Sequence, residues 1–508
     1  MFFNKFKSFL TDIGKRIIVN LDNQELRKLV ETVITESRIK PVKVVNPIEQ
    51  YTVDEMFIVY IIGKDGVLEY AVVEPDYNDE VVDAVYKLYH INPHCNDVEC
   101  LQETIARSND NVLQRIYSTY PLQVTYYYLK LASGYGALYP LTRDALIEEI
   151  SGSSDDTCLS IIHRKYSWYG WMNTNICVDP HAIDRIVLSL ARKAGRHLSL
   201  AYPVAEGITS EGFRVSLTYG REVSRKGSSF VIRKKPVSPW TITKLIDHGM
   251  LNSLVAAYLW LVMELRGSIL IVGGVGTGKT TLMQGLLTLI PPSRRVVTIE
   301  DTPEIAATTG LWDSLVERVS VIGDSAGIDM YALLKFSLRR RPDYLVVGEV
   351  RGIEARLLVQ ASRLGHGIIA TMHAESAEAA IERLIGPPIS LPRNMLSNIW
   401  CIVVMESEYG KRRVKGVYEI GKRLGLIEVF KRIEDSRYKP SDPREVAEKT
   451  LRLKHVLDVD DIINELRNRV MTLERLVSNG VFEFNRLSDE LSRYYYEVIE
   501  KEVLNKSG

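Results

Sequence analysis

The stretch GGVGTGKTTL, residues 273–282, constrains the fold of this chain more strongly than any other segment. It fits the pattern G-x-x-x-x-G-K-[ST], in which backbone N–H groups surround the phosphates of a nucleotide. The apolar run SILIVGG precedes it, and the amphipathic segment KTTLMQGLLTLI follows it. A strand, a phosphate-binding loop and a helix are expected in that order, and such a unit requires an α/β sheet behind the loop.

Two side chains of this loop are expected to act directly on a nucleotide. Lys279 should reach the β and γ phosphates, and Thr280 should ligate Mg²⁺. The N-terminus of the following helix adds its dipole to phosphate binding. The residues expected to contact the nucleotide are Gly273, Gly274, Val275, Gly276, Thr277, Gly278, Lys279, Thr280 and Thr281.

Short, continuously apolar runs recur between helical segments from residue 239 onward. They are SILIVGG, RRVVTIED, DYLVVGE, GIIATMHA and NIWCIVVME. Strands without polar alternation are what a parallel sheet covered by helices on both faces requires. The pattern therefore predicts a nucleotide-binding α/β domain in the C-terminal half of the chain.

Acidic residues end two of these apolar runs. Glu300, Asp301 and Glu304 follow RRVVTI, and Glu349 closes the strand in RRRPDYLVVGEVRG. Because ligands bind at the carboxyl ends of strands in such sheets, these carboxylates can hold Mg²⁺ or polarise an attacking water. The alternative for the first group is an acidic turn that caps a helix, which Pro303 supports. Glu349 could be either the base or a metal ligand.

A polar pair ends a third run. In RLGHGIIATMHAES, Thr371 and His373 stand at the carboxyl end of an apolar strand, where a sensor of the γ-phosphate would lie. A lone histidine is more often structural, so this residue depends on its context.

The sequence as a whole predicts five segments. YTVDEMFIVYIIGKDGVLEYAVVEP predicts a β-hairpin, and a glycine-punctuated β-rich region ends near Pro236 and Pro239. The expected division is a helical arm at 1–45, an α+β domain at 46–125, a PAS-like β-rich domain at 126–238, the α/β domain at 239–440 and a helical extension at 441–508.

Two apolar segments bear on membrane contact. LVAAYLWLVM, residues 254–263, is half the length of a membrane span and predicts a buried helix. MFFNKFKSFLTDIGKRII lacks a cleavage site for a signal peptide, and its apolar residues share one helical face. That helix could dock on a membrane protein or the lipid surface, or pack on the chain's own N-terminal domain.

Charge and cysteine content limit partners and location. Lys plus Arg and Asp plus Glu each number 64, so no basic excess indicates nucleic acid as a partner. The five cysteines are too few and scattered to indicate a disulfide framework, which favours a reducing, cytoplasmic compartment. Four residues of types that bind metals lie close together in the sequence, but the second half of a metal site is not found elsewhere in it. The alternative to a metal site is a loop with buried thiols. The cluster is His90, His94, Cys95 and Cys100.

The phosphate loop followed by IEDTPE, GEVRG and GH-x6-H resembles the secretion-superfamily ATPases. These are the hexameric motors of type II and type IV secretion, type IV pili and archaeal surface filaments, and they call the last three motifs the Asp box, Walker B and His box. RRRPDYLVVGEVRG and AAYLWLVMELRGSILIVGG look most like the archaeal branch. The resemblance covers roughly residues 50–430. It implies a RecA-like P-loop NTPase motor domain preceded by α+β N-terminal domains.

Site roles also follow from this resemblance. It implies ATP as substrate with Mg²⁺, Glu304 and Glu349 as candidates for water activation and metal support, and His373 as γ-phosphate sensor with His366 as its partner. Family members also place arginines of the preceding domain against the nucleotide, often across a subunit interface. The candidates here are Arg214, Arg221, Arg225 and Arg233. The sequence departs from the family in reading SRLGHG, where Thr-Gly-His is common, and in lacking a tetracysteine insert.

The expected function is therefore an ATP-driven assembly motor. It would form a homo-hexamer in the cytoplasm at the inner face of the membrane, act on a polytopic membrane platform protein and bind no nucleic acid. The alternatives are a conjugation-type translocase of the same superfamily and a slow nucleotide-gated switch. An N-K-x-D base reader and an L-S-G-G-Q signature are both missing, which disfavours a GTPase and a transporter ATPase.

Overall fold

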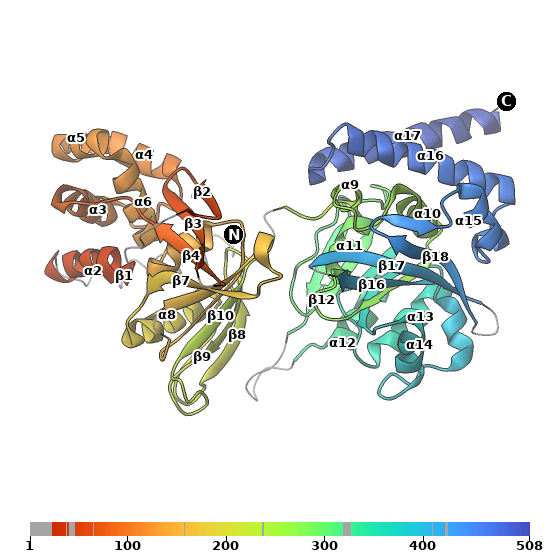
Figure 1. Ribbon diagram of the computed structural model, residues 1–508, viewed down its shortest axis with the longest axis horizontal. Coiled ribbons are helices and arrows are strands. Elements are labelled where there is room, and N and C mark those ends of the chain that lie inside the picture. The colour runs from red at the N-terminus through yellow and green to blue at the C-terminus, as the bar shows by residue number, and fades with distance from the viewer. Residues whose placement is uncertain are drawn as a thin grey trace. The chain divides into compact units, whose positions relative to one another are not determined.

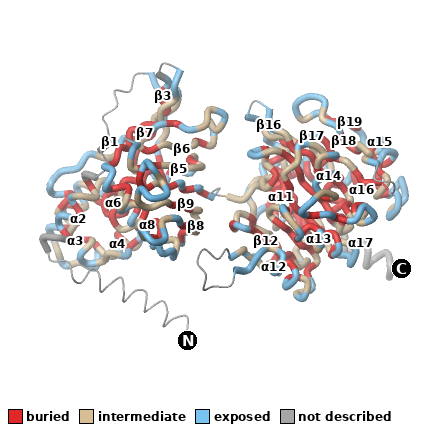
Figure 2. The backbone as a smooth tube through the Cα atoms, turned by 90° about the horizontal axis from the view of Figure 1, so that it is seen from below, coloured by how far each residue is buried: buried red, intermediate tan, exposed pale blue. Residues whose placement is uncertain are grey.

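The structure is a computed structural model in which the chain divides into two compact units, Met1–Pro236 and Val237–Gly508 (Figure 1). Buried residues fill the interior of each unit, as the red segments of Figure 2 show. The residues that the structure describes are 23–36, 38–39, 46–64, 66–156, 158–235, 238–318, 327–408, 410–421 and 425–507. The helix expected at residues 1–18 lies outside them.

The first unit is built on one large sheet, which has ten strands among the described residues. Its order is β2-β3-β4-β7-β6-β5-β10-β9-β8, with β1 paired to β7. The strands are β1 (Arg38–Ile39), β2 (Glu49–Val53), β3 (Phe57–Lys64), β4 (Val67–Val73), β5 (Ile147–Ser153), β6 (Cys158–His163), β7 (Trp171–Cys177), β8 (Val204–Ile208), β9 (Arg214–Thr218) and β10 (Ser229–Arg233). The predicted hairpin is confirmed, because β3 and β4 pair antiparallel.

Helices pack against this sheet and complete a single core. Side chains alternate along the strands as a sheet buried on one face requires: Val215 and Leu217 of β9 are buried, whereas Ser216 between them is not. The helices are α2 (Asn23–Glu36), α3 (Asp79–Ile91), α4 (Val98–Arg107), α5 (Asn111–Thr119), α6 (Pro121–Ala132), α7 (Tyr139–Arg143) and α8 (Pro180–Lys193). One sheet and one core thus span both segments, 46–125 and 126–238, and the finer division proposed from the sequence stays a prediction.

The cysteines correct an expectation from the sequence. Disulfides join Cys95 to Cys100 and Cys158 to Cys177, and Cys401 is buried and free. Cys158 and Cys177 are cross-strand partners on β6 and β7, a neighbourhood that sequence spacing does not reveal. The inference of a reducing compartment from unpaired cysteines is therefore withdrawn.

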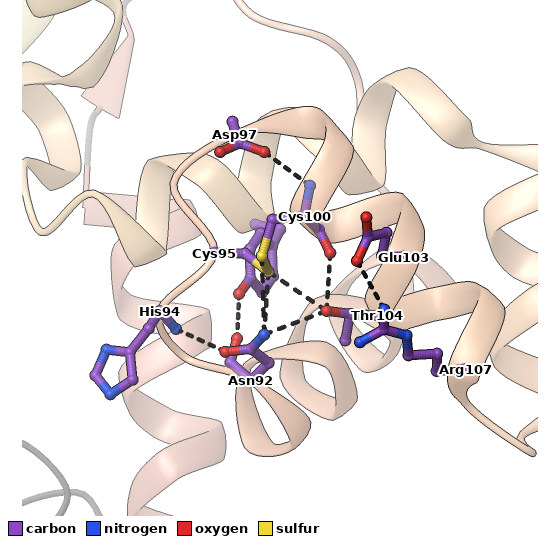
Figure 3. The surroundings of a disulfide bond; sticks show 9 residues. Asn92, His94, Cys95, Asp97, Cys100, Glu103, Thr104 and Arg107 are labelled. Carbon is purple, nitrogen blue, oxygen red and sulfur yellow. Dashed lines mark hydrogen bonds and ion pairs between the residues drawn. A yellow bond between two sulfur atoms is a disulfide. The ribbon is translucent and has the colours of Figure 1, made fainter. Parts of the chain in front are cut away.

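The first disulfide occupies the cluster that raised the question of a metal. The side-chain amide of Asn92 donates to the sulfur of Cys95 at 3.2 Å and to the Thr104 hydroxyl at 3.2 Å, while the ring of His94 points away (Figure 3). Asp97 caps helix α4 by accepting from the backbone N–H of Cys100. Because the sulfurs are bonded to each other, neither is a buried thiol or a thiolate ligand.

The second unit is the predicted α/β domain. Its sheet, nine-stranded in the described residues, has the order β13-β12-β14-β15-β11-β16-β17-β18-β19, and the strands from β13 to β16 run parallel. The strands are β11 (Ser268–Gly273), β12 (Val296–Glu300), β13 (Trp312–Val316), β14 (Tyr344–Val347), β15 (Gly367–His373), β16 (Cys401–Glu408), β17 (Lys411–Ile420), β18 (Leu426–Glu434) and β19 (Arg437–Lys439).

Helices cover both faces of this sheet. Ile269 and Ile271 of β11 join a core on one face, and Leu270 and Val272 join a separate core on the other, as period-2 side-chain alternation dictates. The helices are α9 (Ile242–Asp247), α10 (Ser253–Glu264), α11 (Lys279–Leu287), α12 (Met330–Ser337), α13 (Glu354–Arg363), α14 (Ala377–Ile385), α15 (Pro443–Lys449), α16 (Val459–Ser478) and α17 (Phe484–Ser507).

The C-terminal helices pack against the same unit (Figure 1). Trp260 of α10 donates its indole N–H to the hydroxyl of Tyr495 of α17 at 2.6 Å, and Thr243 donates to the carbonyl of Val481. The predicted buried helix is confirmed, because residues 254–263 of α10 are all buried. Among the described helices, none combines the length and hydropathy that a bilayer crossing needs.

Candidate nucleotide site

The parallel register brings the carboxyl ends of four strands to one edge of the sheet. Gly273, the last residue of β11, lies opposite His373, the last residue of β15. Val347, the last residue of β14, pairs with Ala370 on one side and with Ile299 on the other. The phosphate loop, Glu349, His373 and the acidic turn after β12 therefore share this edge, where open α/β sheets bind ligands.

The phosphate loop depends on two glycines with positive φ. Gly276 has φ +72° and Gly278 has φ +91°, a region that residues with a Cβ rarely adopt. Gly278 is the N-cap of α11, so the helix begins at Lys279 and its free backbone N–H groups face the loop. Val275 at the tip is 88% exposed. The loop thus has the backbone that cradles an anion.

Lys279 is held in the loop that it closes. Its ammonium donates to the carbonyls of Gly273 at 3.1 Å and Gly274 at 2.7 Å. Burial lowers the pKa of Lys279, and the Glu349 carboxylate opposes that shift. An incoming phosphate can replace these two carbonyls as the acceptor of the ammonium.

Glu349 and His373 form a polar pair beside this lysine. His373 Nε2 lies 3.6 Å from Glu349 Oε1, and Arg351 donates to Glu349 Oε2 at 2.7 Å. Burial alone would raise the pKa of Glu349, but the hydrogen bond and charge of Arg351, with His373 and Lys279, lower it overall. Glu349 is therefore ionised at neutral pH.

The same neighbours keep His373 neutral. Burial lowers its pKa first, the positive charge of Lys279 lowers it further, and Glu349 only partly opposes them. The carbonyl of His373 accepts from Arg383 of α14 at 2.8 Å, which fixes the end of β15. A neutral imidazole at this position exchanges hydrogen bonds without adding charge.

Three residues position Glu349, and the sequence analysis selected only Thr371 among them. Glu354 Oε1 accepts from the backbone N–H groups of Arg351 and Gly352 at 2.6 and 2.7 Å, which shapes the turn after β14. The hydroxyl of Thr371 donates to the carbonyl of Gly348 at 2.5 Å, tying β15 to that turn. The pattern G-E-x-R-G-x-E contains Arg351 and Glu354, but only the fold gives their roles.

The acidic residues of the turn after β12 differ in their burial and in their contacts. Glu300 is 2% exposed, and its Oε1 accepts from the backbone N–H groups of Glu304 and Ile305 at 2.8 and 3.0 Å. This Oε1 oxygen holds the turn together, and the expected role of Glu300 as a metal ligand stays a prediction. Asp301 is exposed, and Oδ2 lies 3.9 Å from a guanidinium nitrogen of Arg351. Glu304 is partly exposed and remains a candidate.

Comparisons with known proteins show the family of this chain. The profile described as "Type II/IV secretion system protein" matches residues 213–404. The uncharacterized protein MJ0900 of Methanocaldococcus jannaschii is 32% identical over 382 residues, covering 72% of this chain and 68% of that protein. The chain belongs to the type II/IV secretion ATPase superfamily. Its RecA-like fold and the resemblance found in the sequence are thereby confirmed.

Two further similarities are more limited. A putative conjugal transfer protein of Mycobacterium tuberculosis is 33% identical over 204 residues, 39% of this chain and 58% of that protein. The crystal structure of the pilus retraction motor PilT with bound ADP shares 20% identity, with a TM-score of 0.37, covering 55% of this chain and 80% of that one.

The two histidines of the His box of this secretion ATPase lie at opposite ends of strand β15. His366 precedes β15 and His373 ends it, so they lie about 20 Å apart at 3.3 Å per residue. The ring Nδ1 of His366 is 2.7 Å from the carbonyl of Pro342. Within one chain, His366 therefore cannot be the phosphate-sensing partner of His373 that the resemblance implied.

The four candidate arginines lie in the first unit and form two pairs. Arg214 and Arg233 are cross-strand partners at one end of the β9–β10 hairpin. Arg221 and Arg225 lie in the connection at the other end, where both are exposed. β9 has five residues and rises about 3.4 Å at each step, which separates the two pairs by about 14 Å along the hairpin and favours contact of only one pair with a given phosphate group.

The phosphate-loop edge fits a Mg²⁺ ion that accompanies a nucleotide. The hydroxyl of Thr280, partly exposed at the N-terminus of α11, makes no hydrogen bond within the described part of the chain. Asp301 and the ionised Glu349 add carboxylate oxygens nearby. Hydroxyl, carboxylate and water oxygens are the ligands that Mg²⁺ prefers.

Proposed function

We propose that this chain hydrolyses ATP with Mg²⁺ and uses the energy to power assembly of a pilus-like filament or type II-like secretion. The observation that carries the proposal is the meeting of Lys279, Glu349 and His373 beside the phosphate loop. It supplies a cation for phosphate, an ionised carboxylate for water and a neutral imidazole. A protein that only bound phosphate would not need the last two.

Each side chain has a separate task in this mechanism. Lys279 exchanges its two loop carbonyls for phosphate oxygens. Glu349 orients the attacking water and accepts its proton, a contribution of about 10²- to 10⁴-fold in rate. His373, 3.6 Å from Glu349, donates a hydrogen bond toward the γ-phosphate and reports its presence. Glu304 is the alternative base.

Mg²⁺ neutralises the negative charge of the β and γ phosphates when it is bound. Thr280 supplies a direct ligand oxygen, and Asp301 and Glu349 contribute through water. Arg351 limits how far the Glu349 carboxylate can move, because one of its oxygens is held at 2.7 Å.

Assembly is the second part of the proposal. The chain acts as a homo-hexamer in which one pair of hairpin arginines reaches the nucleotide of a neighbouring subunit. An arginine supplied in this way raises the rate by roughly 10³- to 10⁵-fold. The ring works in the cytoplasm at the inner face of the membrane and acts on a polytopic platform protein.

The test is ATPase activity against protein concentration, with size determined by light scattering in the same samples with Mg-ATP. Specific activity that rises as larger rings form supports the motor. Constant activity from a monomer would mean that the site is complete in one chain, and the nucleotide-gated switch would replace the motor.

A conjugation-type translocase is the second candidate, supported by the similarity to a protein named as a conjugal transfer protein. Equal numbers of acidic and basic residues weigh against a nucleic-acid channel. Binding of single-stranded DNA that weakens steeply with salt would favour this candidate. Absence of such binding, with ATPase activity intact, would favour the assembly motor.

A further inference from the structure

A basic side chain on the opposite side of the phosphate loop from Glu349 has no role in the mechanism above. Gly278, the glycine before Lys279, is packed against Arg412 of β17 and Met250. A Cβ at Gly278 would lie 3.2 Å from Met250 Cε and 3.3 Å from Arg412 Cδ. The aliphatic stem of Arg412 therefore lies against the loop itself.

Strand topology places Arg412 at this edge independently of that contact. β16 runs parallel to β11, with Val404 level with Val272. It continues three residues further to Ser407, which is the cross-strand partner of Arg412. Since β17 runs back from this end, Arg412 stands beyond the carboxyl end of β11, where the phosphate loop begins.

The pleat of β17 directs Arg412 toward the phosphate loop. The same pleat directs the adjacent Arg413 to the other face of the strand. Arg412 shares its face with Val414, which is fully buried in the core that includes α11. Arg413 projects from the other face and pairs with Asp435 at 2.8 Å. Arg412, by contrast, forms no ion pair or hydrogen bond within the described residues.

The backbone beneath Arg412 is firmly held. The N–H of Val414 donates to the carbonyl of Met250 at 2.9 Å, and the buried hydroxyl of Tyr438 donates to the carbonyl of Val414 at 2.7 Å. Met250 is 6% exposed. The position of Arg412 next to the loop is thus fixed by the fold, while its guanidinium remains available.

The reacting groups define which end of a nucleotide meets Arg412. Glu349 and His373 follow β14 and β15, on one side of β11, so the γ-phosphate of a nucleotide in the proposed site would lie there. β16 and β17 lie on the other side of β11, so the remainder of that nucleotide would extend toward them. A planar guanidinium stacks well on an aromatic base.

We propose that Arg412 contacts the nucleoside end of the bound nucleotide from within the same chain, with its guanidinium stacked on the base. The inference rests on the proposed nucleotide site and assigns it a residue that neither the motifs nor the family profile includes. Arg412 is a binding residue in this account, and it takes no part in the chemical step.

The experiment measures displacement of a fluorescent ATP analogue from the full chain by ATP, ADP and inorganic tripolyphosphate. Arg412→Ala should weaken ATP and ADP equally, by roughly 3- to 30-fold for a lost stacking contact. It should leave the competition by tripolyphosphate unchanged. Arg412→Lys should also lose most of the affinity, because an ammonium lacks the planar group.

Control variants separate failure of this inference from failure of the nucleotide site. Lys415→Ala removes an exposed cation from the same strand and should bind like the wild type. If neither wild type nor control binds the analogue, the proposed site itself fails. If wild type binds, Lys279→Ala does not, and Arg412→Ala keeps wild-type affinity, only this inference is overturned. An equal loss of affinity for tripolyphosphate in Arg412→Ala would also overturn the inference, because Arg412 would then contact phosphate. A melting curve like that of the wild type establishes that each variant is folded.

Discussion

His373 Nε2 lies 3.6 Å from Glu349 Oε1, although 24 positions separate the two residues along the chain. The pair exists because β14 and β15 are adjacent and parallel and both end at the same edge. It combines an ionised carboxylate with a neutral imidazole, since the pKa of each is lowered. That combination gives the site its expected pH behaviour.

The acid limb of ATP hydrolysis should lie below pH 6.5. His373, whose ordinary pKa is 6.5, has a lowered pKa and stays neutral until the pH falls further, while Glu349 stays ionised to below its ordinary 4.5. The kcat/KM of the wild type, which reports the groups of the free enzyme, should therefore show the inflection from His373 below pH 6.5. An inflection above pH 6.5 that disappears in His373→Asn would contradict the lowered pKa.

Lys279→Ala should abolish nucleotide binding and turnover. The variant removes the ammonium group that donates to the carbonyls of Gly273 and Gly274. Binding of a fluorescent nucleotide and release of phosphate measure the two effects. Lys335→Ala, an exposed lysine on α12, is the matched control. Wild-type turnover in Lys279→Ala would rule out the site.

Glu349→Gln should bind nucleotide normally and hydrolyse it about 10²- to 10⁴-fold more slowly. The amide keeps the shape of the side chain but cannot accept a proton from water. Glu304→Gln is the direct comparison, measured by single-turnover hydrolysis. If Glu304→Gln loses the rate and Glu349→Gln retains it, the base is Glu304.

Only one arginine pair of the β9–β10 hairpin should support assembly-dependent hydrolysis. The double variants Arg214→Ala with Arg233→Ala, and Arg221→Ala with Arg225→Ala, test the two ends separately. The inactive double variant should regain turnover when mixed with Lys279→Ala chains, because each supplies what the other lacks. Equal loss in both double variants, without rescue on mixing, would exclude an arginine supplied across the interface.

Reduction should destabilise the first unit and leave the second unchanged. Both disulfides lie within Met1–Pro236, and the Cys158–Cys177 bridge spans 19 positions, worth about 3 kcal/mol. Denatured chains should titrate one thiol before reduction, from Cys401, and all five cysteines after it. Calorimetry with and without reductant should move only one transition. Five thiols before reduction would exclude both disulfides.

The sequence determined the parts of the site that depend on local order. The phosphate loop needs its glycines and Lys279 at fixed spacing, and the apolar runs around it require a covered parallel sheet. Glu349 and His373 were found because each ends such a run, and parallel strands end at a common edge. These features can be recognised from the sequence alone because residues close together in the chain carry them.

The tertiary structure decided what depends on neighbours from distant segments. His366 and His373 read as a pair in the sequence, yet a seven-residue strand holds them at opposite edges. Cys158 and Cys177 read as unrelated, yet strand pairing joins them. Arg412 lies 134 positions after Gly278, and only the order β11-β16-β17 sets its stem against the loop. Spacing along the chain carries no record of which strands will be neighbours, because hydrophobic burial and strand pairing over the whole sheet decide that.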